Sequence, residues 1–93
     1  MNNLPRIWNY GQYDSDNYGA HSLAVAFDVF TLYYSYDTII AYKDRDDGFV
    51  MRENIWNTTT GKHMNWLDDN HKNRITGAEF EVKLQAMLER HTQ

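Results

Sequence analysis

Histidines are the side chains of this sequence best suited to acid–base or metal chemistry, and there are four: His21, His63, His71 and His91. No two have the spacing that places a pair of zinc ligands on one face of a helix. None has a recognisable local partner that would orient it as a general acid or base. The chain contains no cysteine, which excludes thiolate metal sites, cysteine nucleophiles and disulfides. We therefore predict a protein that is not an enzyme and has no catalytic residues, no metal site and no cofactor.

Two acidic segments invite comparison with cation sites. The first is residues 44–48 (DRDDG). An EF-hand loop that began at Asp44 would need glycine at its sixth position and glutamate at its twelfth, but the fifth residue is Gly48 and the twelfth is Ile55. A solvated hairpin turn explains this segment better. Asp68, Asp69 and His71 fall within four residues, but neighbouring loop side chains rarely converge on an ion without distant partners. Helix caps and solvated loop acids explain them more simply.

Residues 60–63 (TGKH) share a Gly-Lys pair with phosphate-binding loops. They lack the upstream glycine of such loops and the serine or threonine that follows the lysine. Lys62 could still contact an anion at a helix N-terminus. The simpler interpretation is that this segment begins a capped helix.

Composition and charge limit the possible partners. The 93 residues suffice for one domain with a single core, which we expect over residues 1–93. The net charge is −4, and residues 1–60 hold eight acidic against four basic side chains. No cluster of Lys and Arg provides the electrostatic footprint of nucleic-acid binding, so direct contact with nucleic acid is disfavoured. The sequence shows no apolar run of about 18 residues and no signal peptide, so we expect a cytoplasmic protein.

Aromatic residues are the compositional exception, with three tryptophans, four phenylalanines and seven tyrosines. Aromatic sheet faces can stack nucleic-acid bases. Tyr and Trp are also enriched at protein interfaces. Packing in the core of a small domain is the simplest interpretation. Where these residues are exposed, the acidic balance favours a protein interface over nucleic acid.

The residues before position 57 predict strands. Residues 1–21 form an irregular, aromatic-rich segment with a possible short strand over residues 6–10. The Asp-Gly step within residues 44–48 is a strong hairpin signal. The apolar run at residues 39–42 lacks alternation, which predicts an interior strand covered on both sides. Residues 22–56 are expected to form an antiparallel meander of about four strands, over 22–27, 31–36, 38–43 and 49–56.

Residues 57–93 predict a loop and two helices. A short helix around Met64 is expected to end near residue 69. Thr76 and Glu79 form a capping box at the start of the last helix. Its apolar stripe consists of Phe80, Leu84, Met87, Leu88 and His91. We therefore predict an α+β fold in which one face of the antiparallel sheet is covered by the C-terminal helix and the shorter helix.

Three segments carry a likeness to a known group of proteins: residues 10–21 (YGQYDSDNYGAH), 31–38 (TLYYSYDT) and 52–66 (RENIWNTTTGKHMNW). Through them the chain resembles a family of uncharacterised small proteins encoded by phages, plasmids and other prokaryotic mobile elements. The resemblance extends over about residues 7–90. It implies a viral or mobile-element origin and the cytoplasm of a prokaryotic host, and it carries over no catalytic residue.

These observations predict a small acidic phage-type protein that binds and inhibits a host protein, such as a CRISPR-type defence nuclease. Its acidic residues would steer it towards a basic groove. The expected partner-binding residues are Tyr13, Tyr18, Asp44, Asp46, Asp47, Glu53, Lys62 and His63.

Two alternatives stay open. One is a nucleic-acid-binding accessory protein of a mobile element, using aromatic residues with Lys62, Lys72 and Arg74. The other is a small hydrolase or metal-dependent enzyme, using His63 with Asp68 or Asp69.

Overall fold

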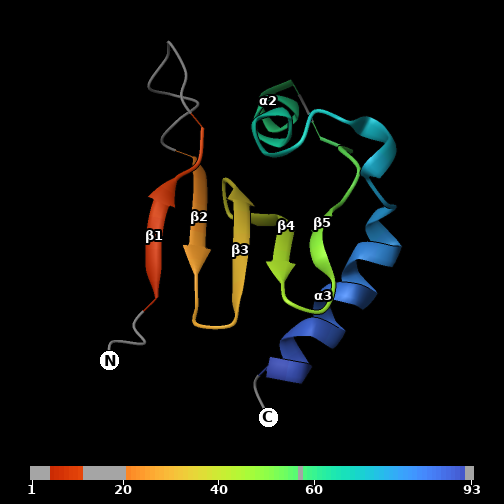
Figure 1. Ribbon diagram of the computed structural model, residues 1–93. Coiled ribbons are helices and arrows are strands. Elements are labelled where there is room, and N and C mark those ends of the chain that lie inside the picture. Colours follow the sequence, from red (N-terminus) through yellow and green to blue (C-terminus); the bar gives the residue numbers. More distant parts are fainter. Residues whose placement is uncertain (1–4, 12–20, 57, 92–93) are drawn as a thin grey trace.

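The computed structural model describes residues 5–11, 21–56 and 58–91, apart from the side chains of residues 58 and 59. Within these residues the chain forms a five-stranded antiparallel sheet and two α-helices (Figure 1). The strands are β1 Arg6–Asn9, β2 Ser22–Ala26, β3 Phe30–Ser35, β4 Thr38–Asp44 and β5 Gly48–Met51. The helices are α2 Thr58–Leu67, the short 3₁₀ helix η1 His71–Asn73 and α3 Gly77–His91. The α+β class is confirmed, with one strand more than expected because β1 pairs with β2.

The strands follow one another in the sheet in chain order, as the predicted meander requires. The β4–β5 hairpin is confirmed: the Asp44 carboxylate accepts the backbone N–H of Asp47 at 2.7 Å, and Gly48 has φ +70°. The predicted strand over residues 49–56 is too long. β5 ends at Met51 because the chain there bonds outside the sheet, where the Ile75 amide donates to the Met51 carbonyl at 3.0 Å.

An extra residue in β4 explains its continuous apolar run. Tyr33 pairs with Ala41 and Tyr34 with Ile39, which leaves Ile40 as a β-bulge. Ile40 and Ala41 are therefore buried in the same cluster. The next residue, Tyr42, belongs to a different cluster. The prediction that this strand is covered on both sides is confirmed.

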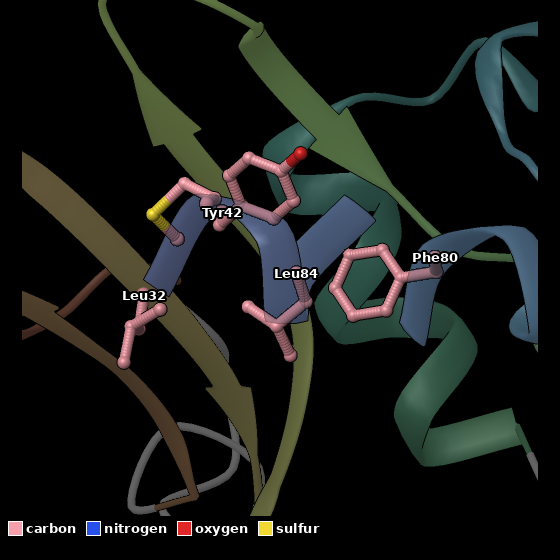
Figure 2. Close-up of a cluster of buried hydrophobic side chains, with 5 residues drawn as sticks. Leu32, Tyr42, Phe80 and Leu84 are labelled. Carbon is pink, nitrogen blue, oxygen red and sulfur yellow. The ribbon is translucent and has the colours of Figure 1, made fainter. Parts of the chain in front are cut away.

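The larger core cluster lies between α3 and one face of the sheet (Figure 2). It is built by the apolar stripe that the sequence predicts for the last helix. Three α3 residues pack against two sheet residues: Phe80, Leu84 and Met87 against Leu32 and Tyr42. Leu32 and Tyr42 are paired directly across β3 and β4, so both point to this face.

The smaller cluster lies on the opposite face, beneath α2. Tyr33 is next to Leu32 in β3, and Ala41 is next to Tyr42 in β4. Successive side chains of a strand alternate between faces, so Tyr33 and Ala41 point to the face opposite α3. Ala41 and Met51 pack with the fully buried Met64 of α2. The expectation that both helices cover one face is wrong. Helical spacing shows that each helix has an apolar side, but it carries no information on which face of the sheet that side meets.

The Thr76 half of the capping box at α3 is confirmed, while the Glu79 side chain bonds to the Thr76 hydroxyl. The Thr76 hydroxyl oxygen accepts the backbone N–H of Glu79 at 3.2 Å, and the hydroxyl donates to the Glu79 carboxylate at 3.2 Å. The first helical bond runs from the Phe80 amide to the Thr76 carbonyl at 2.9 Å. One amide of the first turn is thus satisfied by a side chain, which fixes where the helix begins.

Arg52 is a buried cation whose guanidinium lies beside the start of α3. Its guanidinium pairs with the Glu81 carboxylate at 3.3 Å and lies 4.7 Å from the ring centroid of Trp56. A Cβ atom added at Gly77 would overlap this guanidinium. An alanine at this position would therefore require the Arg52 guanidinium to move.

We predict that Gly77→Ala lowers the free energy of unfolding by about 1–3 kcal/mol, because the methyl group displaces Arg52 from its buried contacts. Urea denaturation of the variant measures the change. In an Arg52→Ala background the same substitution should cost little, since the clash is gone. A stabilising Gly77→Ala, which helix propensity alone would give, contradicts the prediction.

Candidate functional site

The residues expected to contact a partner do not form one site. Tyr13 and Tyr18 lie outside the described residues. The remaining six fall at two separate places. Three are in or beside the β4–β5 turn, Asp44, Asp46 and Asp47, and three are in or just before α2, Glu53, Lys62 and His63.

Asp44 anchors the end of α3 to the β4–β5 turn. Its fully buried carboxylate lies 2.5 Å from Arg90 Nη2 and 2.9 Å from His91 Nε2. Arg90 also pairs with Asp46 at 3.1 Å and with Asp47 at 3.3 Å. The turn acids thus meet the Arg90 cation at a helix C-terminus, where positive charge is favourable. Their observed role is to hold two elements together, and Asp44 has no surface to offer a partner.

The electrostatics of this network follow from its hydrogen bonds. Burial acts to raise the pKa of Asp44, but the backbone amide of Asp47 and the side chains of Arg90 and His91 outweigh it and lower the pKa to about 2. The Tyr42 hydroxyl donates to the Asp47 carboxylate at 2.6 Å. Burial, together with this bond, raises the pKa of Tyr42 well above its usual value. Asp44 therefore stays ionised and Tyr42 stays protonated throughout the neutral range.

The same network contains a set of atoms with metal-ligand spacing. Ligand atoms of Asp44, Asp46 and His91 lie within 4.8 Å of one another. Arg90 bonds to both of these carboxylates and uses the acceptor sites that an ion would need. The arrangement is that of a salt-bridge network, and an ion would have to displace the guanidinium.

Asp68 stabilises the loop that follows α2 through two hydrogen bonds. Its carboxylate accepts the Asn70 backbone N–H at 2.9 Å and the Asn73 side-chain amide at 3.2 Å. The Asn70 bond is the main cause that lowers the pKa of Asp68. This is the capping role that the sequence suggests for the segment.

Glu53 and Lys62 are exposed, whereas His63 is fully buried. The His63 ring nitrogen Nδ1 lies 2.7 Å from the Ser35 hydroxyl, which also bonds to the Thr60 hydroxyl at 3.2 Å. A serine bonded to histidine is the geometry of an activated nucleophile. Here the bonds join β3 to α2, and a buried imidazole has no surface for a partner. The sequence gives no signal for this group, because Ser35 and His63 meet only through tertiary packing.

A pocket of about 230 Å³ opens beside this polar group. The hydroxyls of Ser35 and Thr60 and the Ile40 side chain line it, together with the exposed rings of Tyr36 and Trp56. Asp37 and Thr38 complete the lining.

Tyr36 has φ +58°, a left-handed conformation that costs a bulky residue about 1–2 kcal/mol. It lies in the two-residue loop between β3 and β4, where glycine or asparagine is usual. The Tyr36 ring stacks on His21 at 4.3 Å, and its amide donates to the His21 carbonyl at 2.9 Å. These contacts hold an exposed aromatic ring at the edge of the pocket despite the strain.

The second feature is a partly exposed surface that we call the open sheet face: Arg6, Trp8, Thr31, Tyr33, Lys43 and Phe49, of which Thr31 and Tyr33 are half-buried. Cross-strand pairing places all six on the face that carries α2. Within the described part of the chain, α2 covers only the end of this face near the β3–β4 turn (Figure 1). The open sheet face thus shares a face with α2, and Tyr33 within it packs against the cluster beneath that helix.

Two rings of the open sheet face, Tyr33 and Phe49, contact each other, and Tyr10 adds a third ring beside Tyr33. Tyr33 meets Phe49 edge-to-face with centroids 5.6 Å apart, and Tyr10 meets Tyr33 in the same manner at 5.9 Å. Burial within this group raises the pKa of Tyr33. Trp8 is 41% and Phe49 36% exposed. The surface is therefore an ordered aromatic group, which the sequence does not predict because its members meet only through strand register.

Fold and surface together define a small α+β protein in which an antiparallel meander carries one helix on each face. The matching family model spans residues 9–82, from the end of β1 into α3, and the chain belongs to this family of unknown function (DUF8033). No curated protein and no solved structure matches the chain. In the described ranges, no helix combines the length and apolar character needed to cross a bilayer.

Proposed function

We propose that this chain is a non-enzymatic interaction protein that binds a host protein through the open sheet face and inhibits it. The observation that carries the proposal is that Trp8 on β1 and Phe49 on β5 are both exposed on the same face of the sheet. Tryptophan, tyrosine and arginine dominate the binding energy of protein interfaces, and Trp8, Tyr33 and Arg6 supply all three.

The aromatic group is arranged for binding before a partner arrives. Strands β1, β3 and β5 hold the backbones of Trp8, Tyr33 and Phe49, and the Tyr33–Phe49 contact restricts two of the rings. Little conformational entropy remains to be lost when they are covered. Trp8 is 41% and Phe49 36% exposed, so a partner that covers them removes further apolar area from water.

Charge determines which kind of partner surface fits. Arg6 and Lys43 are the charged members of the open sheet face, whereas Asp44 and Asp46 are paired with Arg90 on the α3 side. A partner surface that complements the open sheet face is apolar at its centre and acidic at its rim. A CRISPR-type nuclease is one host protein to test, with the contact made outside its basic nucleic-acid groove.

The same charge pattern favours a second candidate, binding of single-stranded nucleic acid. The six side chains of the open sheet face include two cations and no carboxylate, although the chain as a whole carries −4. Bases could stack on Trp8 and Phe49 while phosphates contact Arg6 and Lys43. Two cations give a small electrostatic term, so we rank this function second.

The test compares the wild-type chain with a Trp8→Ser/Phe49→Ser double variant as bait in affinity capture from a bacterial lysate. A protein retained by the wild type is then purified, its activity is assayed with and without the chain, and its Kd is measured for both baits. We expect inhibition by the wild type and a Kd at least about 30-fold weaker for the double variant, since a hot-spot residue contributes 2 kcal/mol or more.

Val82→Ser is the matched control, because Val82 is 71% exposed on α3, on the opposite side of the sheet. Equal binding by the double variant, or loss of binding by Val82→Ser, contradicts the proposed surface. A titration with single-stranded oligonucleotide, followed by tryptophan fluorescence, decides the second candidate. Two phosphate contacts predict a slope of about −1.4 for log K against log salt concentration, and no binding at low salt removes this candidate.

A further inference from the structure

The pocket beside the β3–β4 turn has aromatic walls and a polar floor. Tyr36 and Trp56 are both more than two-fifths exposed, and the buried residues Ser35 and Thr60 line the same pocket. The floor is fixed, because Ser35 is bonded to both Thr60 and His63. Strand β3 and helix α2 thus hold the polar groups in place while both rings face solvent.

Asp37 gives the pocket its charge. It supplies the single formally charged group among the residues described as lining the pocket. The Thr38 hydroxyl reaches the Asp37 carboxylate only at 3.4 Å, which leaves acceptor capacity on that group. A carboxylate beside aromatic faces attracts a cation and repels an anion.

The Trp56 ring already binds one guanidinium. The Arg52 Cζ lies 4.7 Å from the ring centroid, and the charge of Arg52 is balanced by Glu81 at 3.3 Å. This contact fixes the Trp56 ring at the pocket edge. Tyr36 is held in a left-handed backbone conformation that tyrosine rarely adopts, which places the second ring there. Strain retained at a pocket edge is typical of binding sites.

We propose that this pocket binds the guanidinium or ammonium group of an arginine or lysine side chain on a polypeptide. Asp37 pairs with the cation, Tyr36 and Trp56 offer their π faces, and the Ser35 and Thr60 hydroxyls accept hydrogen bonds. The pocket, of about 230 Å³, has room for one such side chain. The pocket is separate from the open sheet face and does not depend on the function proposed there.

The test titrates N-acetyl-arginine amide into isotopically labelled protein and follows chemical shifts. We expect shifts at the Trp56 indole N–H and at the amides of Tyr36 and Asp37. The uncharged isostere N-acetyl-citrulline amide should bind at least about tenfold more weakly, because it retains the shape but not the charge. Methylguanidinium should bind more weakly than the capped arginine. Equal or tighter binding of methylguanidinium would overturn the assignment to a polypeptide side chain.

Variants separate the contribution of the Asp37 charge to binding from that of the aromatic rings. Asp37→Asn should weaken binding of the capped arginine by roughly tenfold, whereas Asp69→Asn, which removes the same charge from an exposed loop, should leave it unchanged. Tyr36→Asn removes one ring and retains a residue that tolerates positive φ, so it should fold normally and bind weakly. Equal binding of citrulline, an Asp37→Asn protein that binds as well as the wild type, or shifts centred outside the pocket would each overturn the proposal.

Discussion

Replacing Phe80 by alanine is expected to lower the free energy of unfolding by about 3–5 kcal/mol, the largest effect of any single substitution considered for this chain. Phe80 is fully buried in the cluster between α3 and the sheet. Its ring lies 5.8 Å from that of Tyr42 and 5.9 Å from the Arg52 guanidinium carbon. The substitution loses the burial of the ring and leaves a cavity that fixed strands cannot close.

Urea denaturation, followed by circular dichroism, measures this loss. Val82→Ala is the control on the same helix, because Val82 faces solvent and its truncation should change stability by less than about 0.5 kcal/mol. A Phe80→Ala protein as stable as Val82→Ala would show that α3 does not pack on the sheet as described.

The second large effect concerns Asp44 and pH. The pKa of this carboxyl is about 2 in the folded protein against 3.8 ordinarily. Burial opposes this lowering, and the bonds from the Asp47 amide, Arg90 and His91 overcome it. Because the pKa is lower in the folded state, the unfolded chain takes up the proton first as pH falls. Asp44 therefore contributes about 2–3 kcal/mol that is complete above about pH 5 and is lost as pH falls from about 4 to 2.

Asp44→Asn tests this contribution. We expect it to lower the free energy of unfolding at neutral pH by about 2–3 kcal/mol and to flatten the decline of stability between about pH 4 and pH 2. Denaturation curves at a series of pH values measure both effects. Asp69→Asn, at an exposed loop position, should retain the wild-type profile. An Asp44→Asn protein with the wild-type stability and pH profile contradicts the anchoring role.

The strands and the last helix could be predicted because their signals are local. Alternation in residues 22–36 and the Asp-Gly step at Gly48 specify hairpins, and Thr76 with Glu79 specifies where α3 begins. The placement of the helices could not be predicted. It depends on which face of the sheet each apolar stripe meets, and the bulge at Ile40, which adds a residue to the α2 side, is visible only in the pairing.

The candidate site was less accessible to prediction than the fold. The sequence marks Asp44, Asp46 and Asp47 as free acids, but Arg90, more than forty residues away, pairs with all three, and His91 bonds to Asp44. It marks His63 by residue type and does not reveal its burial against Ser35. The open sheet face is the converse case. Its aromatic residues are conspicuous in the composition, but only strand register shows that three of them share a surface with two cations.

Covalent footprinting of the chain, free and bound to a captured protein, tests the proposed docking surface most directly. Oxidative labelling modifies exposed side chains, aromatic ones fastest and aliphatic ones such as valine more slowly, so the same residue can be compared between the free and bound states. We predict that binding protects Trp8 and Phe49 while Val82, on the opposite side, keeps its labelling. Protection of Val82 with unchanged labelling of Trp8 and Phe49 would contradict the assignment of the open sheet face as the binding surface.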